Sequence, residues 1–303
     1  MKENNGLISS GAAIARRNKR YVVWFYLLNL LFAWLGTAAF STLAHGVLDH
    51  SLYAGKLLHG FDLAVLIELL SRPEFGPMQT SSEPAMLFAL LFWLASMFFM
   101  PGILLGYASD HRIPRDEFYR ACGHNIWRFV RLFVMFLIIA GISGGVLLAI
   151  QNALVRAADQ TSYETLPFFT QMIGLILIFL VLTVIRIWFD QAQTDVVLAD
   201  QAAVRKSIAF GFRQTKRNFS RLLGSYVFIA LVALAALVAG IVLWNTIVPP
   251  ASVFGAFLVS QLTLLLLLAM RFWQRACGVA SYLQQSMEPI IEREALLSVA
   301  TSQ

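Results

Sequence analysis

Histidines and acidic residues at helical spacing occur in the segment 45–83, and such pairs are the residue types that bind zinc. On a helix, spacings of three or four residues place both members of a pair on one face, as a shared ion requires. Neither pair forms a known zinc motif such as His-Glu-x-x-His, and these side chains are usually only solvated when they lie outside a membrane. We therefore expect no metal site, no cofactor and no catalytic residue. The residues concerned are His45 with Asp49, His59 with Asp62, and the nearby His50 and Glu68.

Charged side chains are rare inside the long apolar runs of the sequence. Only Arg186 and Arg271 fall within them, and both are close to an end of their run. A long arginine side chain there can reach the membrane surface, so we interpret both as structural. Because no Asp, Glu or His is expected in the middle of a run, a proton- or sodium-driven mechanism is disfavoured. The sequence also contains no nucleophile elbow, phosphate-binding glycine loop or dinucleotide fingerprint.

The composition places the chain among polytopic membrane proteins. It has 303 residues, of which 58% are hydrophobic and 13% charged, with a mean hydropathy of +0.70. Such values are typical of a protein that crosses a membrane several times. The net charge of +6 is explained by basic residues between spans, so no nucleic-acid partner is expected. Cys122 and Cys277 fall on the side expected to be reducing, so no disulfide is expected.

The apolar runs predict an all-α fold with six transmembrane helices, since about 20 helical residues cross a bilayer. The predicted organisation is a basic N-terminus (1–20), a six-span membrane domain (21–285) with an outer loop at 45–83, and a tail (286–303). Gly141-x-x-x-Gly145 predicts a close helix contact in the third span. The predicted spans are 21–44, 84–108, 129–155, 167–188, 222–248 and 253–276.

The distribution of basic residues predicts the orientation. Of the 23 Lys and Arg residues, all but Lys56, Arg72 and Arg156 lie before the first span, in the connector 110–131, between Arg186 and the end of the connector 190–221, or from Arg271 onward. By the positive-inside rule these segments lie in the cytoplasm, together with both termini. Basic clusters recur before the odd-numbered spans. That recurrence indicates either three repeated hairpins or only the general preference for basic residues at membrane interfaces.

Both long connectors are predicted to contain amphipathic helices. In the larger one, apolar residues from Val197 to Phe219 share one side of a helical wheel, with basic residues opposite or flanking. One interpretation is contact with anionic lipid headgroups. The alternative is that the apolar side packs on the spans and the charges only fix topology. The apolar stripe is Val197, Val204, Ile208, Phe212 and Phe219, and the possible lipid contacts are Arg205, Lys206, Arg213, Lys216 and Arg217. In the smaller connector Phe118, Cys122, Ile126 and Phe129 share a face.

The larger connector also carries a family resemblance. The residues Asp200-Gln-Ala-Ala-Val204-Arg-Lys-Ser207-Ile-Ala-Phe210, continuing to Asn218-Phe219, resemble the connector of a loose bacterial group. That group includes the polytopic membrane domain of some glycerophosphodiester phosphodiesterases, together with related multispan proteins. The resemblance implies a six-span helical domain in a bacterial inner membrane. It implies no activity, because no catalytic residue can be mapped onto this chain.

These patterns predict a non-enzymatic inner-membrane protein that acts as a scaffold, assembly or regulatory component. Its expected partners are anionic lipids and a second membrane protein or another copy of itself. A second interpretation is a permease or lipid-handling transporter with a cavity among the spans. An enzyme with a metal site on the outer surface is a more distant third.

Overall fold

The computed structural model describes residues 6–48, 67, 78–161, 163, 165–249 and 252–301, and these are helical almost throughout. The predicted metal-ligand pairs lie outside the described residues, except for His45, of which only the backbone is described. Within the described residues, six helices are long and apolar enough to cross a membrane. The prediction of an all-α fold with six transmembrane helices is therefore confirmed.

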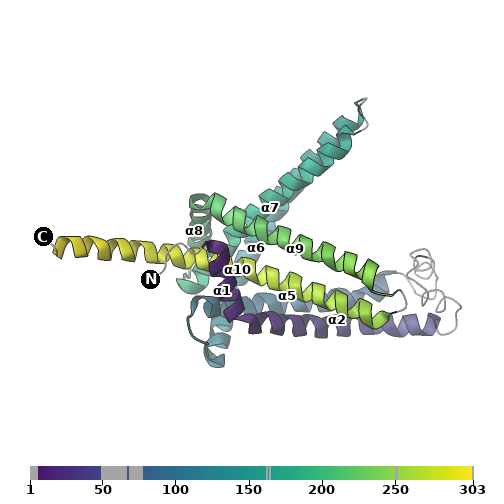
Figure 1. The fold of residues 1–303 in the computed structure, drawn as a ribbon, viewed down its shortest axis with the longest axis horizontal. Coiled ribbons are helices and arrows are strands. Elements are labelled where there is room, and N and C mark those ends of the chain that lie inside the picture. Colours follow the sequence, from purple (N-terminus) through teal and green to yellow (C-terminus); the bar gives the residue numbers. More distant parts are fainter. Residues whose placement is uncertain are drawn as a thin grey trace. The chain divides into compact units, whose positions relative to one another are not determined.

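Figure 1 shows the described helices, which follow one another along the chain. The described helices are α1 (Leu7–Arg17), α2 (Lys19–Leu48), α5 (Met78–Ala108), α6 (Arg115–Asp159), α7 (Leu166–Leu198), α8 (Val204–Arg217), α9 (Phe219–Ile247) and α10 (Val253–Thr301).

Several helices extend beyond the predicted spans because they continue where the apolar run ends. The predicted connector 110–131 is mostly the beginning of α6, which continues without a break into the third span. Helix α7 continues ten residues past the predicted end of its span, to Leu198. Helix α10 runs into the predicted tail as far as Thr301, and α1 occupies the N-terminal segment, for which no helix was predicted.

The chain forms two compact units. Unit 1 comprises Met1–Arg17, Phe99–Ala230 and Phe272–Gln303, and unit 2 comprises Asn18–Phe98 and Leu231–Arg271. In unit 2, aromatic rings join α2 to α5, for example Phe25 with Phe92 at 6.4 Å between centroids. The Tyr26 hydroxyl donates to Gln261 Oε1 at 3.0 Å and so joins α2 to α10.

Unit 1 contains α1, α6, α7 and α8 together with the adjoining parts of α5, α9 and α10. Helices α6 and α7 form an antiparallel hairpin (Figure 1). Near its tip, the Gln151 side chain donates to Thr170 O at 3.0 Å and lies against Gly174, where a Cβ would overlap it. The predicted contact at Gly141 and Gly145 is wrong, because no described atom lies within 4 Å of a Cβ built at either glycine.

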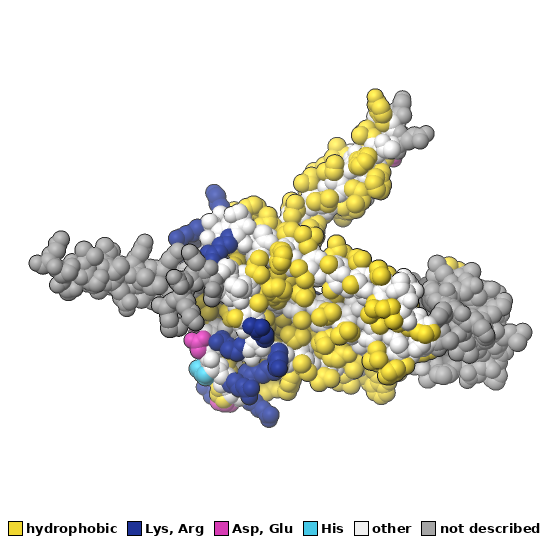
Figure 2. Space-filling model, viewed as in Figure 1, with side chains coloured by type: hydrophobic (Ala, Val, Ile, Leu, Met, Phe, Trp, Pro, Cys, Tyr) yellow, Lys and Arg dark blue, Asp and Glu magenta, His cyan; other side chains and the backbone are white. Residues whose placement is uncertain are grey.

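The outer surface of the α6–α7 hairpin is apolar. Large side chains such as Ile142, Phe168 and Ile173 are exposed along it. Figure 2 shows hydrophobic side chains covering this hairpin, whereas Lys and Arg side chains lie at α8 and, in a denser group, near α1. Such exposure would be costly in water and is expected for side chains that face lipid.

Candidate functional site

The last three turns of α7 form the centre of unit 1. Most side chains between Ile185 and Val197 are buried, including polar ones, although the sequence there is no longer continuously apolar. Helix α6 covers one side, where the Phe136 and Phe189 rings lie 5.3 Å apart. Helices α8, α9 and α10 also contact this segment. The first residues of the predicted connector 190–221 are therefore the end of α7, and other helices enclose them.

A buried carboxylate, Asp190, lies at the middle of this segment. The Tyr226 hydroxyl of α9 donates to Asp190 Oδ2 at 3.0 Å. Two guanidinium groups approach the same carboxylate, with Arg186 Nε at 3.9 Å from Oδ2 and Arg275 Nη1 at 4.0 Å from Oδ1. Those two distances are ion pairs but too long for hydrogen bonds. Arg186, expected to extend freely to the membrane surface, is therefore partly neutralised by a residue one turn away.

Amide side chains extend this cluster onto α10. Gln191 is fully buried and its Nε2 donates to Gly278 O at 3.2 Å. Gln274 Nε2 donates to Tyr226 O at 3.2 Å. We call Asp190, Gln191, Tyr226, Gln274 and Arg275 the polar hub. Buried polar groups cost free energy unless they are paired, so the hub fixes α7, α9 and α10 relative to one another.

A second pair lies one turn farther along α7. The Tyr282 hydroxyl donates to Asp195 Oδ1 at 3.2 Å, and the Tyr282 ring lies 5.6 Å from that of Phe210 on α8. These contacts bring α8 to α7 and α10.

Helix α8 packs on α7 through small and polar side chains rather than through the predicted apolar stripe. A Cβ built at Gly211 would lie 2.6 Å from Trp188 O and 2.9 Å from Ala192 N, so the two backbones cross closely there. Trp188 Nε1 donates to Ile208 O at 2.7 Å. The buried residues of α8 are Val204, Ser207, Gly211, Gln214 and Thr215.

The predicted wheel fails for a physical reason: close backbone packing selects for small residues, not for apolar ones. Phe212 is 52% exposed and its ring meets that of Trp188 edge to face, with centroids 5.2 Å apart. Val197 belongs to α7 and Phe219 begins α9. Of the predicted stripe, only Val204 and Ile208 lie on the packed side of α8.

The predicted lipid contacts are all exposed on α8. We call Arg205, Lys206, Arg213, Lys216 and Arg217 the basic face. Contact of these five side chains with lipid stays a prediction. Phe212 lies at the margin of the same face, rather than opposite it.

Some buried polar atoms near α8 have no hydrogen-bond partner in the part of the chain that the structure describes. They belong to α7, to α8 and to the residue after α8. An ordered water commonly satisfies such atoms. The atoms are Arg186 Nη2, Gln191 Oε1, Ser207 Oγ, Gln214 Nε2, Thr215 Oγ1 and Asn218 Nδ2.

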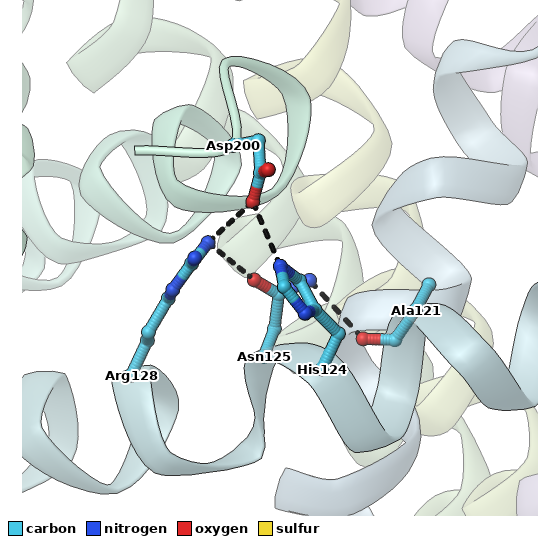
Figure 3. A network of polar contacts seen from close by, with 5 residues as sticks. All are labelled: Ala121, His124, Asn125, Arg128 and Asp200. Atoms are coloured by element: carbon cyan, nitrogen blue, oxygen red, sulfur yellow. Dashed lines mark hydrogen bonds and ion pairs between the residues drawn. The ribbon is translucent and has the colours of Figure 1, made fainter. Parts of the chain in front are cut away.

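The loop between α7 and α8 is tied to α6 by Asp200, which has a positive φ of 47°. Figure 3 shows the Asp200 carboxylate between two side chains of α6. Arg128 Nη1 lies 2.5 Å from Asp200 Oδ1, and His124 Nε2 lies 3.1 Å from the same oxygen. Hydrogen bonds from these two groups hold the pKa of the Asp200 carboxyl below its usual range. We call Asp200, His124, Asn125 and Arg128 the Asp200 network.

Helix α1 is attached to the same unit. Trp273 Nε1 of α10 donates to Ile8 O at 3.0 Å, and a Cβ at Gly11 would lie 2.3 Å from Cys277 Sγ. Arg17 donates to Ser109 O at 2.7 Å and forms an ion pair with Asp110 at 3.1 Å. Both cysteines are free, as expected.

The fold and this arrangement define the chain as a multi-pass α-helical membrane protein. Among the described residues, most of the buried polar side chains lie where α7, α8, α9 and α10 of unit 1 meet. Comparison with protein-family models, with curated proteins and with solved structures gives no match to the chain. The resemblance to the membrane domains of glycerophosphodiester phosphodiesterases therefore stays a prediction.

Proposed function

We propose that this protein is a non-enzymatic scaffold or regulatory component of a bacterial inner membrane, and that it contacts anionic lipid through the basic face of α8. Both termini and the basic face lie in the cytoplasm in this proposal. Its further partner is a membrane protein or a second copy of the chain.

The observation that carries the proposal is the composition of the exposed side of α8. Five cationic side chains lie there beside Phe212, whose ring contacts that of Trp188 edge to face. Aromatic rings favour the level of the lipid headgroups, and Lys and Arg are attracted to anionic headgroups at the same level. The combination supports a helix that lies at the membrane surface.

The expected electrostatic attraction between the basic face and anionic lipid is large enough for contact with headgroups but not for insertion of α8 into the hydrocarbon core. Each basic residue close to an anionic surface contributes roughly 1 kcal/mol, and the attraction falls off within a Debye length. Five such residues together contribute a few kcal/mol at low salt. That is enough to enrich anionic lipid around the protein, and too little to draw charged side chains into the hydrocarbon core.

Lipid selectivity of the full-length protein tests this proposal. In vesicles of mixed phosphatidylglycerol and phosphatidylcholine, spin-labelled phosphatidylglycerol should be immobilised by the protein in preference to phosphatidylcholine. Replacing Lys206, Arg213 and Arg217 by Gln should reduce this preference, and so should raised salt. The matched control is Arg156→Gln, which removes a charge near the other end of α6 and should have no effect. An unchanged preference in the triple variant would leave the basic face with a topological role only.

A transporter is the second candidate, and one observation favours it. The hub contains a buried carboxylate, Asp190, which forms ion pairs with Arg275 of the hub and with the neighbouring Arg186. Ionisable groups among membrane helices often mark a substrate path. A cysteine placed at the buried Ser225 would react with a small water-soluble thiol reagent if such a path opens. A scaffold keeps that position sealed.

A further inference from the structure

Within the Asp200 network, Asn125 and Arg128 are held in place by contacts inside α6 that do not involve Asp200. Asn125 is buried, and its Nδ2 donates to Ala121 O at 3.1 Å, one turn back. Arg128 Nη1 in turn donates to Asn125 Oδ1 at 3.1 Å. The Arg128 side chain is only 17% exposed. The guanidinium is therefore oriented by its own helix before any anion binds, which lowers the entropic cost of binding one.

His124 completes a two-donor arrangement. It precedes Arg128 by four residues, so both side chains project from the same face of α6. A carboxylate only accepts hydrogen bonds, so His124 Nε2 carries the proton in its contact with Asp200. Figure 3 shows both groups pointing at the same place.

The Asp200 carboxylate, by contrast, is bound loosely. Its side chain is 69% exposed, and it belongs to the short connection after α7, not to a helix. Its φ of 47° is a conformation that residues other than glycine adopt at some cost, although Asp tolerates it better than most. Water competes for an exposed carboxylate, so ion pairs of such a group contribute little to stability. Asp200 can therefore leave at low cost.

The carboxylate also fits the two donors incompletely. Both Arg128 and His124 contact the same oxygen, Oδ1. A phosphate group has several acceptor oxygens, so it can give each donor an oxygen of its own. Charge-assisted bonds from arginine to phosphate are among the stronger ones in proteins.

The position on α6 fits the level of lipid headgroups. Trp127, adjacent to Arg128, is exposed, and Arg131 lies over its ring at 5.6 Å. Exposed Trp beside Arg is typical of the membrane–water interface. The apolar part of α6 follows directly, so a phosphate of the neighbouring lipids would lie at the height of these donors.

We propose that His124 and Arg128 form a binding site for the phosphate of an anionic phospholipid, and that the Asp200 carboxylate occupies this site in the present conformation. Lipid and Asp200 then compete for the same donors. Binding of lipid releases the connection that leads into α8. The site lies on α6 and not on the basic face, so it holds or fails independently of the proposed function.

Affinity for single lipid molecules tests the competition. Native mass spectrometry of the full-length protein in detergent, titrated with phosphatidylglycerol, gives dissociation constants for the bound lipids. Asp200→Asn keeps the size and the tolerance of positive φ but removes the charge, so it should tighten the strongest site at least threefold. Arg128→Gln in the Asp200→Asn background should abolish that gain. The matched control is Arg131→Gln in the same background. Arg131 is an exposed arginine three residues after Arg128, and its replacement should leave the gain intact.

A second measurement covers the case in which a variant is poorly folded. Hydrogen exchange of the wild-type protein should speed up in residues 199–203 when phosphatidylglycerol replaces phosphatidylcholine in nanodiscs. Inorganic phosphate added to phosphatidylcholine nanodiscs should not reproduce this change. If inorganic phosphate does reproduce it, the site binds free phosphate, and the proposal that the phosphate belongs to a lipid is wrong. Unchanged exchange in these residues, or an Asp200→Asn gain that survives Arg128→Gln, would overturn the site.

Discussion

Within the described part of the chain, the Tyr226 hydroxyl is the side-chain group that donates a hydrogen bond to the buried Asp190 carboxylate, at 3.0 Å. A buried carboxylate loses its water shell and needs donors in return. The arginines lie farther away, so their attraction does not replace a hydrogen bond. The stability of unit 1 therefore depends on this hydroxyl.

Tyr226→Phe tests that dependence. The change removes one oxygen, keeps the ring, and leaves a buried acceptor less well paired. We expect the free energy of unfolding to fall by about 1–3 kcal/mol, measured by denaturant unfolding of the purified protein in detergent. Tyr163→Phe is the matched control, because Tyr163 is 76% exposed; it should change nothing. Equal stability of the two variants would contradict the role of the hydroxyl.

The sequence was least informative about the partners of individual polar residues. Asp190 follows an apolar run, and a charge at that place ordinarily means that the helix has left the membrane. Nothing local shows that Tyr226 and Arg275, far along the chain, surround it. Asp200 and His124 are 76 residues apart, and such pairings follow only from the fold.

At the scale of helices, the crossing of α7 and α8 depends on one missing side chain. The atoms nearest to a Cβ at Gly211 are backbone atoms of α7, which cannot rotate away. Adding a methyl group there must separate the helices.

Gly211→Ala should therefore loosen α8. We expect a destabilisation of about 1–3 kcal/mol from overpacking and faster hydrogen exchange of the α8 amides. The matched control is Gly123→Ala in α6, where a Cβ meets no described atom within 4 Å. That substitution should be neutral or stabilising by up to about 1 kcal/mol, because Ala favours helix more than Gly does. Similar exchange in the two variants would show that α7 and α8 do not cross so closely.

Hydropathy predicted the existence of the spans well and their ends poorly. A span can be recognised from its own residues, because lipid contact requires a continuous apolar surface. The end of a helix depends on what covers it. Helix α7 continues to Leu198 because neighbouring helices enclose it. The wheel for α8 failed because it assumed that a buried face must be apolar.

For the whole molecule, the distribution of charge makes the orientation testable. Tyr163 follows α6 and lies at the end of the hairpin away from α8, whereas Ala209 lies among the basic face and is exposed. A cysteine at Tyr163 should react with an impermeant thiol reagent on intact cells, and one at Ala209 should not. Cys122 and Cys277 are first replaced in both variants.

Permeabilised cells provide the control, since both positions should then react. Labelling of Ala209→Cys alone on intact cells would reverse the orientation. Labelling of both would mean that the segments between them do not cross the membrane as proposed.

The bond between Trp273 and the carbonyl of Ile8 joins positions 265 residues apart. A ribosome makes the chain from its N-terminus, so α1 exists long before α10 has been translated. Until α10 has been made, α1 lacks the surface at Trp273 and Cys277 on which it rests. Its docking therefore waits for α10, and a docked α1 marks a chain in which α10 has been completed and has packed.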